Sequence, residues 1–174
     1  MLSVGFSCIA DEKARVLVLG SLPGQMSLRH QQYYAHPRNS FWRIMGELFE
    51  AGPQLPYSER AARLVQQGIA LWDVCATANR PGSLDSNIQP DTVLRNDFAG
   101  FFNTHPQIKM ICCNGGASAR MYQRLVMPQL AASYQTLRLE PLPSTSPAHA
   151  GMTFEEKLQR WSVIRTALPP HSKA

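Results

Sequence analysis

Four short apolar runs constrain this sequence more than any other feature. They occupy residues 15–19, 69–74, 108–113 and 135–139. Runs of this length are typical of strands buried on both faces, and the segments between them have helical patterns. Because strands that alternate with helices favour a parallel sheet covered on both sides, we predict an α/β fold. Its expected form is a three-layer α/β/α sandwich around a four-stranded parallel sheet.

Helical signals fill the intervals between these runs. Apolar residues recur at helical spacing over residues 41–49. Thr153 and Glu156 form a capping box in front of a last apolar stripe, which Pro169 ends. Three further helices are predicted from their start signals, which are Ser58, Asp91 and the pair Gly115-Gly116.

Length and composition predict a single domain over residues 1–174. The chain is 44% hydrophobic and 17% charged, which excludes a disordered or fibrous protein. No apolar run approaches the ~20 residues that span a bilayer. The first ten residues lack a basic segment and run into Asp11-Glu12, unlike a signal peptide. We therefore expect a cytoplasmic protein that does not contact a membrane.

The cysteines and histidines predict no metal site. Cys8, Cys75, Cys112 and Cys113 include no C-x-x-C pair, and the histidines have no zinc-ligand spacing relative to them. Two of the four cysteines lie inside an apolar run. We expect reduced thiols that serve packing.

Charge is distributed unevenly along the chain. The net charge is +5, and residues 13–46 and 98–139 carry basic side chains but no Asp or Glu. If both segments lie on one face, that face suits a polyanion such as a nucleic acid. The alternative is uneven spacing of the acids with no functional meaning.

The loop after the first apolar run is the most unusual segment. In parallel α/β sheets, ligands bind beyond the carboxyl ends of the strands. This loop begins Gly20-Ser-Leu-Pro-Gly24 and continues with YYAHPRNSFW over residues 33–42. Its glycines allow a ligand to approach the backbone closely, but the loop lacks the pattern of a P-loop or a dinucleotide fingerprint.

These segments resemble the uracil-DNA glycosylase superfamily. Residues 20–42 are similar to its first motif, most closely in the hypoxanthine (deoxyinosine) DNA glycosylase branch, and residues 71–88 also resemble that branch. The sequence LPSTSPA over residues 142–148 resembles the second motif. The resemblance implies a monofunctional DNA repair glycosylase that hydrolyses the N-glycosidic bond of a flipped base, without a cofactor or strand cleavage. Hypoxanthine is the favoured base, with uracil and xanthine as further candidates.

The resemblance also implies which residues hold the base. It places Gly20, Ser21 and Leu22 against the base and Tyr34 as the aromatic ring that stacks on it. The adjacent Tyr33 is expected to serve packing.

Two residues, Asn39 and Asp73, are candidates for positioning the attacking water. Leu22 stands where many relatives carry Asp or Asn, and leucine cannot orient water. In the hypoxanthine branch the resemblance moves this role to Asn39, with Asp73 as its rival. The structural alternatives are a helix cap for Asn39 and a buried carboxylate bonded to backbone for Asp73.

The remaining candidates lie in three other loops. Ser144 stands at the base-contacting position of the second motif, and Ala148 stands where relatives carry a bulkier wedge. Arg80 is a further candidate for contact with DNA. The alternative for the third loop, which follows the third apolar run and begins at Asn114, is a turn needed only for packing. The alternative for His149 is a surface histidine without a functional role. The predicted DNA-binding residues are Gly24, Asn114, Gly115, Gly116, Ser146, Pro147, Ala148 and His149.

The predicted partner is double-stranded DNA that contains a deaminated base. We expect a monomer associated with the nucleoid. Two other functions remain open at this point. One is a catalytically weak or inactive DNA-lesion-binding module of the same fold, for which Leu22 is the best argument. The other is a hydrolase of free nucleosides or nucleotides. No iron–sulfur cluster is expected, because the cysteine spacing does not match the branches that carry one.

Overall fold

The computed structural model describes residues 2–170 and contains a central sheet of parallel strands. The strand order is β3-β2-β6-β7, with β2 in the middle of the sheet next to β3 and β6. The bounds are Val16–Gly20 for β2, Ile69–Asp73 for β3, Met110–Asn114 for β6 and Arg138–Leu142 for β7. The predicted four-stranded parallel sheet is therefore confirmed.

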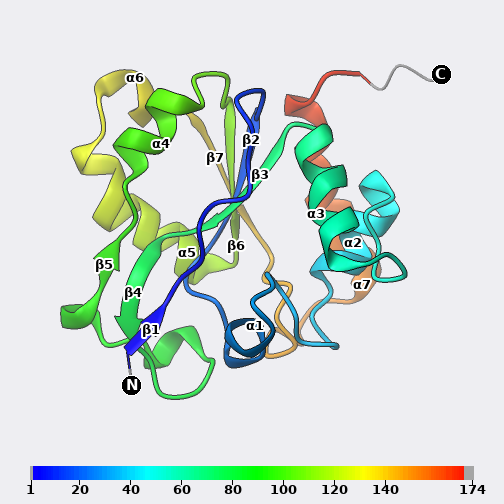
Figure 1. The fold of residues 1–174 in the computed structure, drawn as a ribbon, viewed down its shortest axis with the longest axis horizontal. Helices are drawn as coiled ribbons and strands as arrows, with labels where there is room; N and C mark the ends of the chain where they lie inside the picture. The colour runs from blue at the N-terminus through cyan, green and yellow to red at the C-terminus, as the bar shows by residue number, and fades with distance from the viewer. Residues whose placement is uncertain (1, 171–174) are drawn as a thin grey trace.

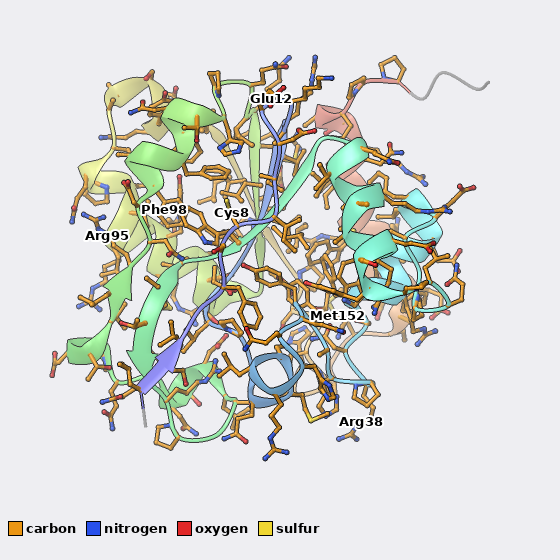
Figure 2. The ribbon with its side chains drawn as sticks, in the orientation of Figure 1. Cys8, Glu12, Arg38, Arg95, Phe98 and Met152 are labelled. Carbon is orange, nitrogen blue, oxygen red and sulfur yellow. The ribbon has the colours of Figure 1, made fainter. Side chains whose placement is uncertain are left out.

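Helices cover both faces of this sheet, as Figure 1 shows. Alternate strand residues point to opposite sides, so Val16 and Val18 enter one core while Leu17 and Leu19 enter the other. The first core packs against α2 (Phe41–Phe49), α3 (Tyr57–Gln66) and α7 (Phe154–Trp161). The second packs against α4 (Phe98–Thr104), α5 (Gly116–Met121) and α6 (Ala132–Gln135). Side chains such as Phe98 fill the space between helix and sheet (Figure 2). The three-layer α/β/α prediction is confirmed.

The fourth strand lies three residues later than the sequence predicted. Residues 135–139 were expected to be extended, but Gln135 ends α6 and β7 begins at Arg138. β7 is an edge strand, and Arg138 and Glu140 form an ion pair on it with N···O 2.6 Å. An edge strand needs no continuous apolar run and tolerates Pro141, which has no N–H to donate. A fully buried apolar run therefore does not mark the position of β7.

A second, antiparallel sheet was not predicted. It has the order β1-β4-β5 and consists of β1 (Leu2–Val4), β4 (Cys75–Asn79) and β5 (Leu94–Arg95). β4 follows β3 after the single residue Val74, so the second apolar run, residues 69–74, forms β3 and leads directly into a strand of the other sheet. Two 3-10 turns, Asp85–Asn87 and Pro90–Thr92, connect β4 to β5.

Two predicted helix starts are wrong. α3 begins at Tyr57 behind Pro56, so Ser58 lies inside the helix instead of capping it. The segment after Asp91 forms β5, and the cap of α4 is Asp97, whose Oδ1 accepts from Gly100 N–H at 3.0 Å. The two errors have different causes: α3 begins behind Pro56 without a side-chain cap, whereas two aspartates precede α4 and only Asp97 bonds to its first turn.

The remaining helix signals agree with the structure. Gly115 is the cap of α5, which continues into a π-helical turn, Tyr122–Val126, and a 3-10 turn, Met127–Gln129. Thr153 and Glu156 form both hydrogen bonds of the capping box. α7 is extended by a 3-10 turn, Ser162–Ala167. None of the helices in residues 2–170 is long and apolar enough to cross a bilayer.

We expect the two aspartates in front of α4 to differ in their contribution to stability. Asp97→Ala should lower the free energy of unfolding by about 1 kcal/mol, because the Gly100 N–H loses its side-chain acceptor. Asp91→Ala is the matched control and should change it by less than ~0.5 kcal/mol. Urea denaturation followed by circular dichroism measures both. Equal losses in the two variants would contradict the assignment of the cap.

Candidate active site

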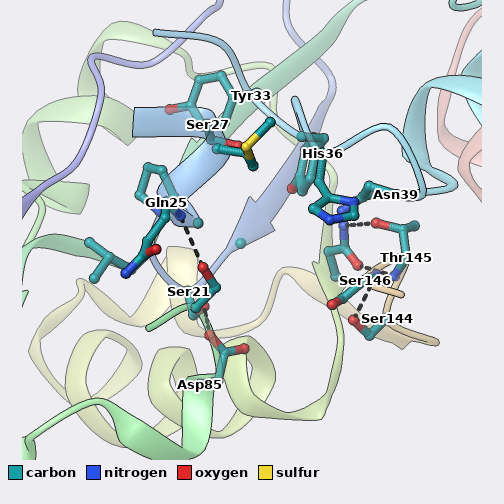
Figure 3. A pocket seen from close by; sticks show the side chains of 18 of the residues that line it. Ser21, Gln25, Ser27, Tyr33, His36, Asn39, Asp85, Ser144, Thr145 and Ser146 are labelled. Carbon is teal, nitrogen blue, oxygen red and sulfur yellow. Dashed lines mark hydrogen bonds between the residues drawn. The ribbon is translucent and has the colours of Figure 1, made fainter. Parts of the chain in front are cut away.

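A pocket of about 430 Å³ opens at the edge of the sheet where β2, β3 and β6 end. Its volume lies in the range of sites that hold one small molecule or base. The short helix α1 (Gln25–His30) contributes to one wall, and the loop after β7 contributes to another (Figure 3). The predicted residues that line it are Gly20, Ser21, Leu22, Gly24, Tyr34, Asn39, Asn114, Ser144, Ser146, Pro147 and Ala148.

Gly20 is at the centre of this site. It ends β2 and pairs in register with Asp73 at the end of β3. A Cβ at position 20 would collide with Oδ1 of Asp73 and come within 3.4 Å of the Tyr34 hydroxyl. The close approach of these two polar groups to the backbone therefore requires glycine at this position.

Asp73 is a buried acid without full hydrogen bonding. Its relative exposure is 3%, and its Oδ2 has no hydrogen-bond partner among the described residues. This differs from the structural alternative, in which backbone groups satisfy the carboxylate. The pKa of Asp73 is raised to about 7, mainly by burial and also by the nearby Asp85, while Arg80 acts in the opposite direction. The group is thus close to half protonated at neutral pH.

Tyr33 and Tyr34 have different environments. Tyr33 is buried, its hydroxyl donates to Ser7 O at 3.2 Å, and its own carbonyl accepts from Trp42 Nε1 at 2.8 Å. Tyr34 is half-buried, adopts φ +56°, and packs on Phe41 with ring centroids 4.0 Å apart. Its hydroxyl has no partner within the part of the chain that the structure describes. This arrangement favours Tyr34 as the ring available to a ligand and Tyr33 as its support.

Asn39 lies directly before Ser40, the N-cap of α2, and also lines the pocket. Its Oδ1 accepts from Phe41 N–H at 3.0 Å at the start of α2. An amide oxygen has two lone pairs, so this bond leaves one for a water in the pocket. The N-cap position itself belongs to Ser40, and the bond from Asn39 to the start of α2 is compatible with its predicted role in positioning water.

Asn114 joins the third loop to the second-motif loop. Its Nδ2 donates to Thr145 Oγ1 at 2.9 Å, and its Oδ1 accepts from Thr145 N–H at 2.9 Å. Ser40 N–H donates to Thr145 O at 3.0 Å, which ties the start of α2 to the same point. Thr145 is therefore a central support that the sequence did not reveal, because it only acts through these tertiary contacts.

Three of the predicted DNA-binding residues do not line the pocket. Gly115 and Gly116 begin α5 behind Asn114, and a Cβ at Gly115 would lie 3.1 Å from Ser144 Cβ. The Gly115 backbone has φ +96°, which explains the need for glycine there. His149 lies beyond the rim, where its carbonyl accepts from Lys157 Nζ at 2.8 Å. Contact of these residues with DNA stays a prediction.

The loop between β4 and β5 forms the wall that sequence reasoning missed. Asp85 Oδ1 accepts from Ser21 Oγ at 2.5 Å, and Ser83 Oγ accepts from Gln25 N–H at 3.0 Å (Figure 3). Arg80 is buried and donates to the carbonyls of Leu22 and Pro23. Arg80 therefore supports the loop that follows β2. The sequence suggested that it contacts DNA, but in the structure it is not exposed for such contact. The acidic residue near Arg80 was the available signal, since a buried Arg needs a carboxylate nearby.

The described residues contain no cluster of His, Cys, Asp or Glu suited to a metal ion. The four cysteines are free, and Cys75, Cys112 and Cys113 are buried. Burial raises the pKa of all three thiols, so they remain protonated in the core. The site therefore consists of backbone amides, two aromatic rings, amide and hydroxyl groups, two carboxylates, the imidazole of His36 and the guanidinium of Arg29.

The pocket thus lies at the carboxyl ends of a parallel sheet, with the Ser146-Pro147 turn at its rim. The model of the Uracil DNA glycosylase superfamily matches residues 6–165, and the chain belongs to this superfamily.

Individual relatives agree with this assignment. A Methanosarcina acetivorans protein named Hypoxanthine DNA glycosylase is 37% identical over 166 residues, which are 95% of this chain and 99% of the relative. A Methanosarcina barkeri protein of the same name is 37% identical over 115 residues, 66% of this chain and 72% of the relative. A solution NMR structure of an M. acetivorans protein, titled as a Uracil DNA glycosylase, matches this chain with a TM-score of 0.77 at 33% identity. The match covers 94% of this chain and 96% of the chain in that structure.

We expect the free energy of unfolding to fall as the pH rises, because the buried carboxyl of Asp73 must then either stay protonated or ionise in the core. Its folded pKa of about 7 lies above the ordinary value of 3.8, so the native state holds a proton that the unfolded chain releases between these pH values. Asp73→Asn should therefore be more stable than wild type by about 1–4 kcal/mol at pH 8. The gain should shrink towards zero as the pH falls to about 4.

Urea denaturation at pH 5 and pH 8 measures this gain. Asp91→Asn, at an exposed position outside the pocket, is the matched control and should show no such pH dependence. A gain for Asp73→Asn that is the same at both pH values would contradict the raised pKa.

Proposed function

We propose that this chain removes hypoxanthine from deoxyinosine in DNA by hydrolysing the N-glycosidic bond, leaving the strand intact. The observation that carries the proposal is the buried, unpartnered carboxyl of Asp73 beside Tyr34 at the base of the pocket. Two relatives named Hypoxanthine DNA glycosylase support it. Uracil and xanthine are the further bases to be compared.

The base must leave the duplex before it can enter this pocket. Extrusion costs a few kcal/mol, and stacking on an aromatic ring offsets roughly 1–3 kcal/mol of it. Tyr34 is the ring suited to this role, because Phe41 supports it from behind and its backbone is fixed at φ +56°. Leu22 and the backbone from Gly20 to Ser21 would contact the remaining surface of the base.

Hydrolysis adds a water oxygen to C1′ as the bond to N9 breaks. The electron pair leaves with hypoxanthine, which takes up a proton, and the water gives up one proton. We propose that Asn39 orients this water through the second lone pair of Oδ1. Since an amide is a poor base, the rate must come mainly from positioning and from stabilising the departing base.

Asp73 is better suited to the base than to the water. Hypoxanthine presents a donor at N1–H next to an acceptor at O6. A neutral carboxyl group has the complementary pair, a carbonyl acceptor and an O–H donor. Burial favours this neutral form. We propose that protonated Asp73 binds the N1–H and O6 edge and stabilises the charge that develops on the leaving base.

The remaining parts of the proposal concern the partner and the setting. We propose double-stranded DNA with a deaminated base as the substrate, bound by a monomer close to the nucleoid. The acid-free segments 13–46 and 98–139 support contact with DNA. Arg29, which lines the pocket, and the exposed Arg38, which projects from the edge of the fold in Figure 2, belong to the first of these segments.

The activity is tested with an end-labelled duplex that contains one deoxyinosine. Wild type should create a site that breaks only after alkali treatment, since base release does not cut the strand. Asn39→Ala should lower the single-turnover rate at least about 100-fold, a typical loss when a group that acts in the transition state is removed. Its affinity for the duplex should change little.

Parallel substrates separate this proposal from its rivals. Binding to the lesion with no alkali-labile product in wild type would favour an inactive lesion-binding module. Release from free deoxyinosine as fast as from the duplex would favour a nucleoside hydrolase. A rate of Asn39→Ala equal to that of wild type would remove Asn39 from the chemistry, since alanine offers no acceptor for the water.

The role of Asp73 predicts a specific pH profile. The single-turnover rate of wild type should fall as the pH rises through about 7, because the ionised carboxylate loses its donor and repels O6. Asp73→Asn should not show this fall, because an amide keeps both an acceptor and a donor at every pH. Asp73→Leu should lose about tenfold or more at pH 6, since it offers neither.

The opposite profile would identify a different role. If Asp73 instead deprotonates the water, the wild-type rate rises through pH 7 and Asp73→Asn is inactive throughout. This outcome would assign the attacking water to Asp73 and leave Asn39 with only its structural bond to Phe41 N–H.

A further inference from the structure

Leu84 is an exposed leucine at the mouth of the pocket. Among the described residues, the large hydrophobic side chains with high exposure are Leu2, Val4, Leu84 and Leu94. The other three lie on the small antiparallel sheet, whereas Leu84, at 52% exposure, lines the pocket. Its apolar surface is exposed to water beside the entry to a base-sized cavity. Exposed apolar surface next to a pocket is typical of a contact site for a ligand or partner.

The backbone on both sides of Leu84 is fixed to the first loop. Ser83 Oγ accepts from Gln25 N–H at 3.0 Å, and Asp85 Oδ1 accepts from Ser21 Oγ at 2.5 Å. The Leu84 carbonyl accepts from Asn87 N–H at 3.0 Å within the following 3-10 turn. The position of Leu84 is thus determined by the same residues that shape the pocket.

Arg80 strengthens this support from beneath. Its buried guanidinium donates to the carbonyls of Leu22 and Pro23 and lies 3.7 Å from Asp85 Oδ1. A side chain that must enter a stacked duplex needs such a rigid base, because a flexible loop would lose conformational freedom on binding.

Ala148 is too small to fill the gap that an extruded base leaves in the duplex. When a base leaves the duplex, it leaves an apolar gap between its stacked neighbours, and proteins commonly fill such gaps with Leu, Ile, Met or Phe. Ala148, in the second-motif loop, also lines the pocket but has only a methyl group. Leu84 has the missing volume and lies on a different loop of the same rim.

We propose that Leu84 is the wedge that inserts into the duplex and occupies the gap left by the extruded base. This inference rests on the proposed glycosylase function and deepens it, since it identifies the residue that holds the base outside the helix. Leu84 acts as a positioning residue and does not contact the bond that breaks.

The test compares duplex and single-stranded substrates of the same sequence. Leu84→Ala should lower the single-turnover rate on inosine paired with cytosine by about tenfold or more, because the contact area of the side chain is lost. On single-stranded DNA, where no gap needs filling, its rate should stay within about twofold of wild type. A pyrene nucleotide placed opposite inosine fills the space of the base pair and should restore the duplex rate of Leu84→Ala.

Leu94→Ala is the matched control. Leu94 is a leucine with 65% exposure on β5 that does not line the pocket, so its truncation should change neither rate. Equal losses of Leu84→Ala on both substrates, no loss on the duplex, or no rescue by pyrene would overturn the wedge. A selective duplex loss in Ala148→Gly, with none in Leu84→Ala, would assign the wedge to Ala148.

A binding measurement separates the wedge from the proposed activity. If wild type releases no hypoxanthine from any substrate, the proposed function fails. Leu84 is then judged on a duplex with a tetrahydrofuran abasic analogue, which has a gap but no base. Leu84→Ala should bind this duplex about tenfold more weakly than wild type, and equal affinity would reject the wedge.

Discussion

The parallel register of β2, β3 and β6 is the constraint on which the site depends. Gly20 pairs with Asp73, and Leu19 pairs with Cys113, so the residues that end the three strands reach the same edge together. A shift of one residue in either pairing would send core side chains to the wrong face, because successive residues point to opposite sides. The two apolar cores that flank the sheet therefore hold Gly20, Asp73 and Asn114 in place.

The loops add a second level of fixation through buried polar contacts. Arg80 and Asp85 hold the loop that follows β2, and Asn114 holds the loop that follows β7 through Thr145. Each contact joins segments that are far apart in the sequence but meet at the edge of the sheet. A pocket formed in this way is largely preorganised, which is what catalysis by positioning requires.

Sequence reasoning could predict the sheet and most of the pocket because both depend on local signals. Buried runs identify β2, β3 and β6, and the Gly-rich and Ser-Pro turns mark two walls. It failed where pairing decides the structure, as with β7, β4 and the cap Asp97. It also missed Thr145, Ser83 and Asp85, since their roles depend on partners as many as 105 residues away.

Three departures from ordinary folding rules meet at this pocket. Asp73 has a buried oxygen without a partner, Tyr34 has a positive φ, and Leu84 exposes a large apolar side chain. The other positive-φ residues with a side chain, Gln31 and Glu50, are the C-caps of α1 and α2, where this conformation ends a helix. Tyr34 is not a helix C-cap; it adopts this conformation in the turn at residues 33–34 that places its ring at the pocket.

Each departure costs stability in the free protein. In the proposed complex, hypoxanthine would satisfy the Asp73 carboxyl and the stacked bases would bury Leu84, while the backbone conformation of Tyr34 would hold its ring ready for the base. Costs that one ligand relieves together, at the end of β3 and in the loop between β4 and β5, are better explained by selection for binding than by chance defects of folding. This common relief links the acid at the base of the pocket to the leucine at its rim in one recognition event.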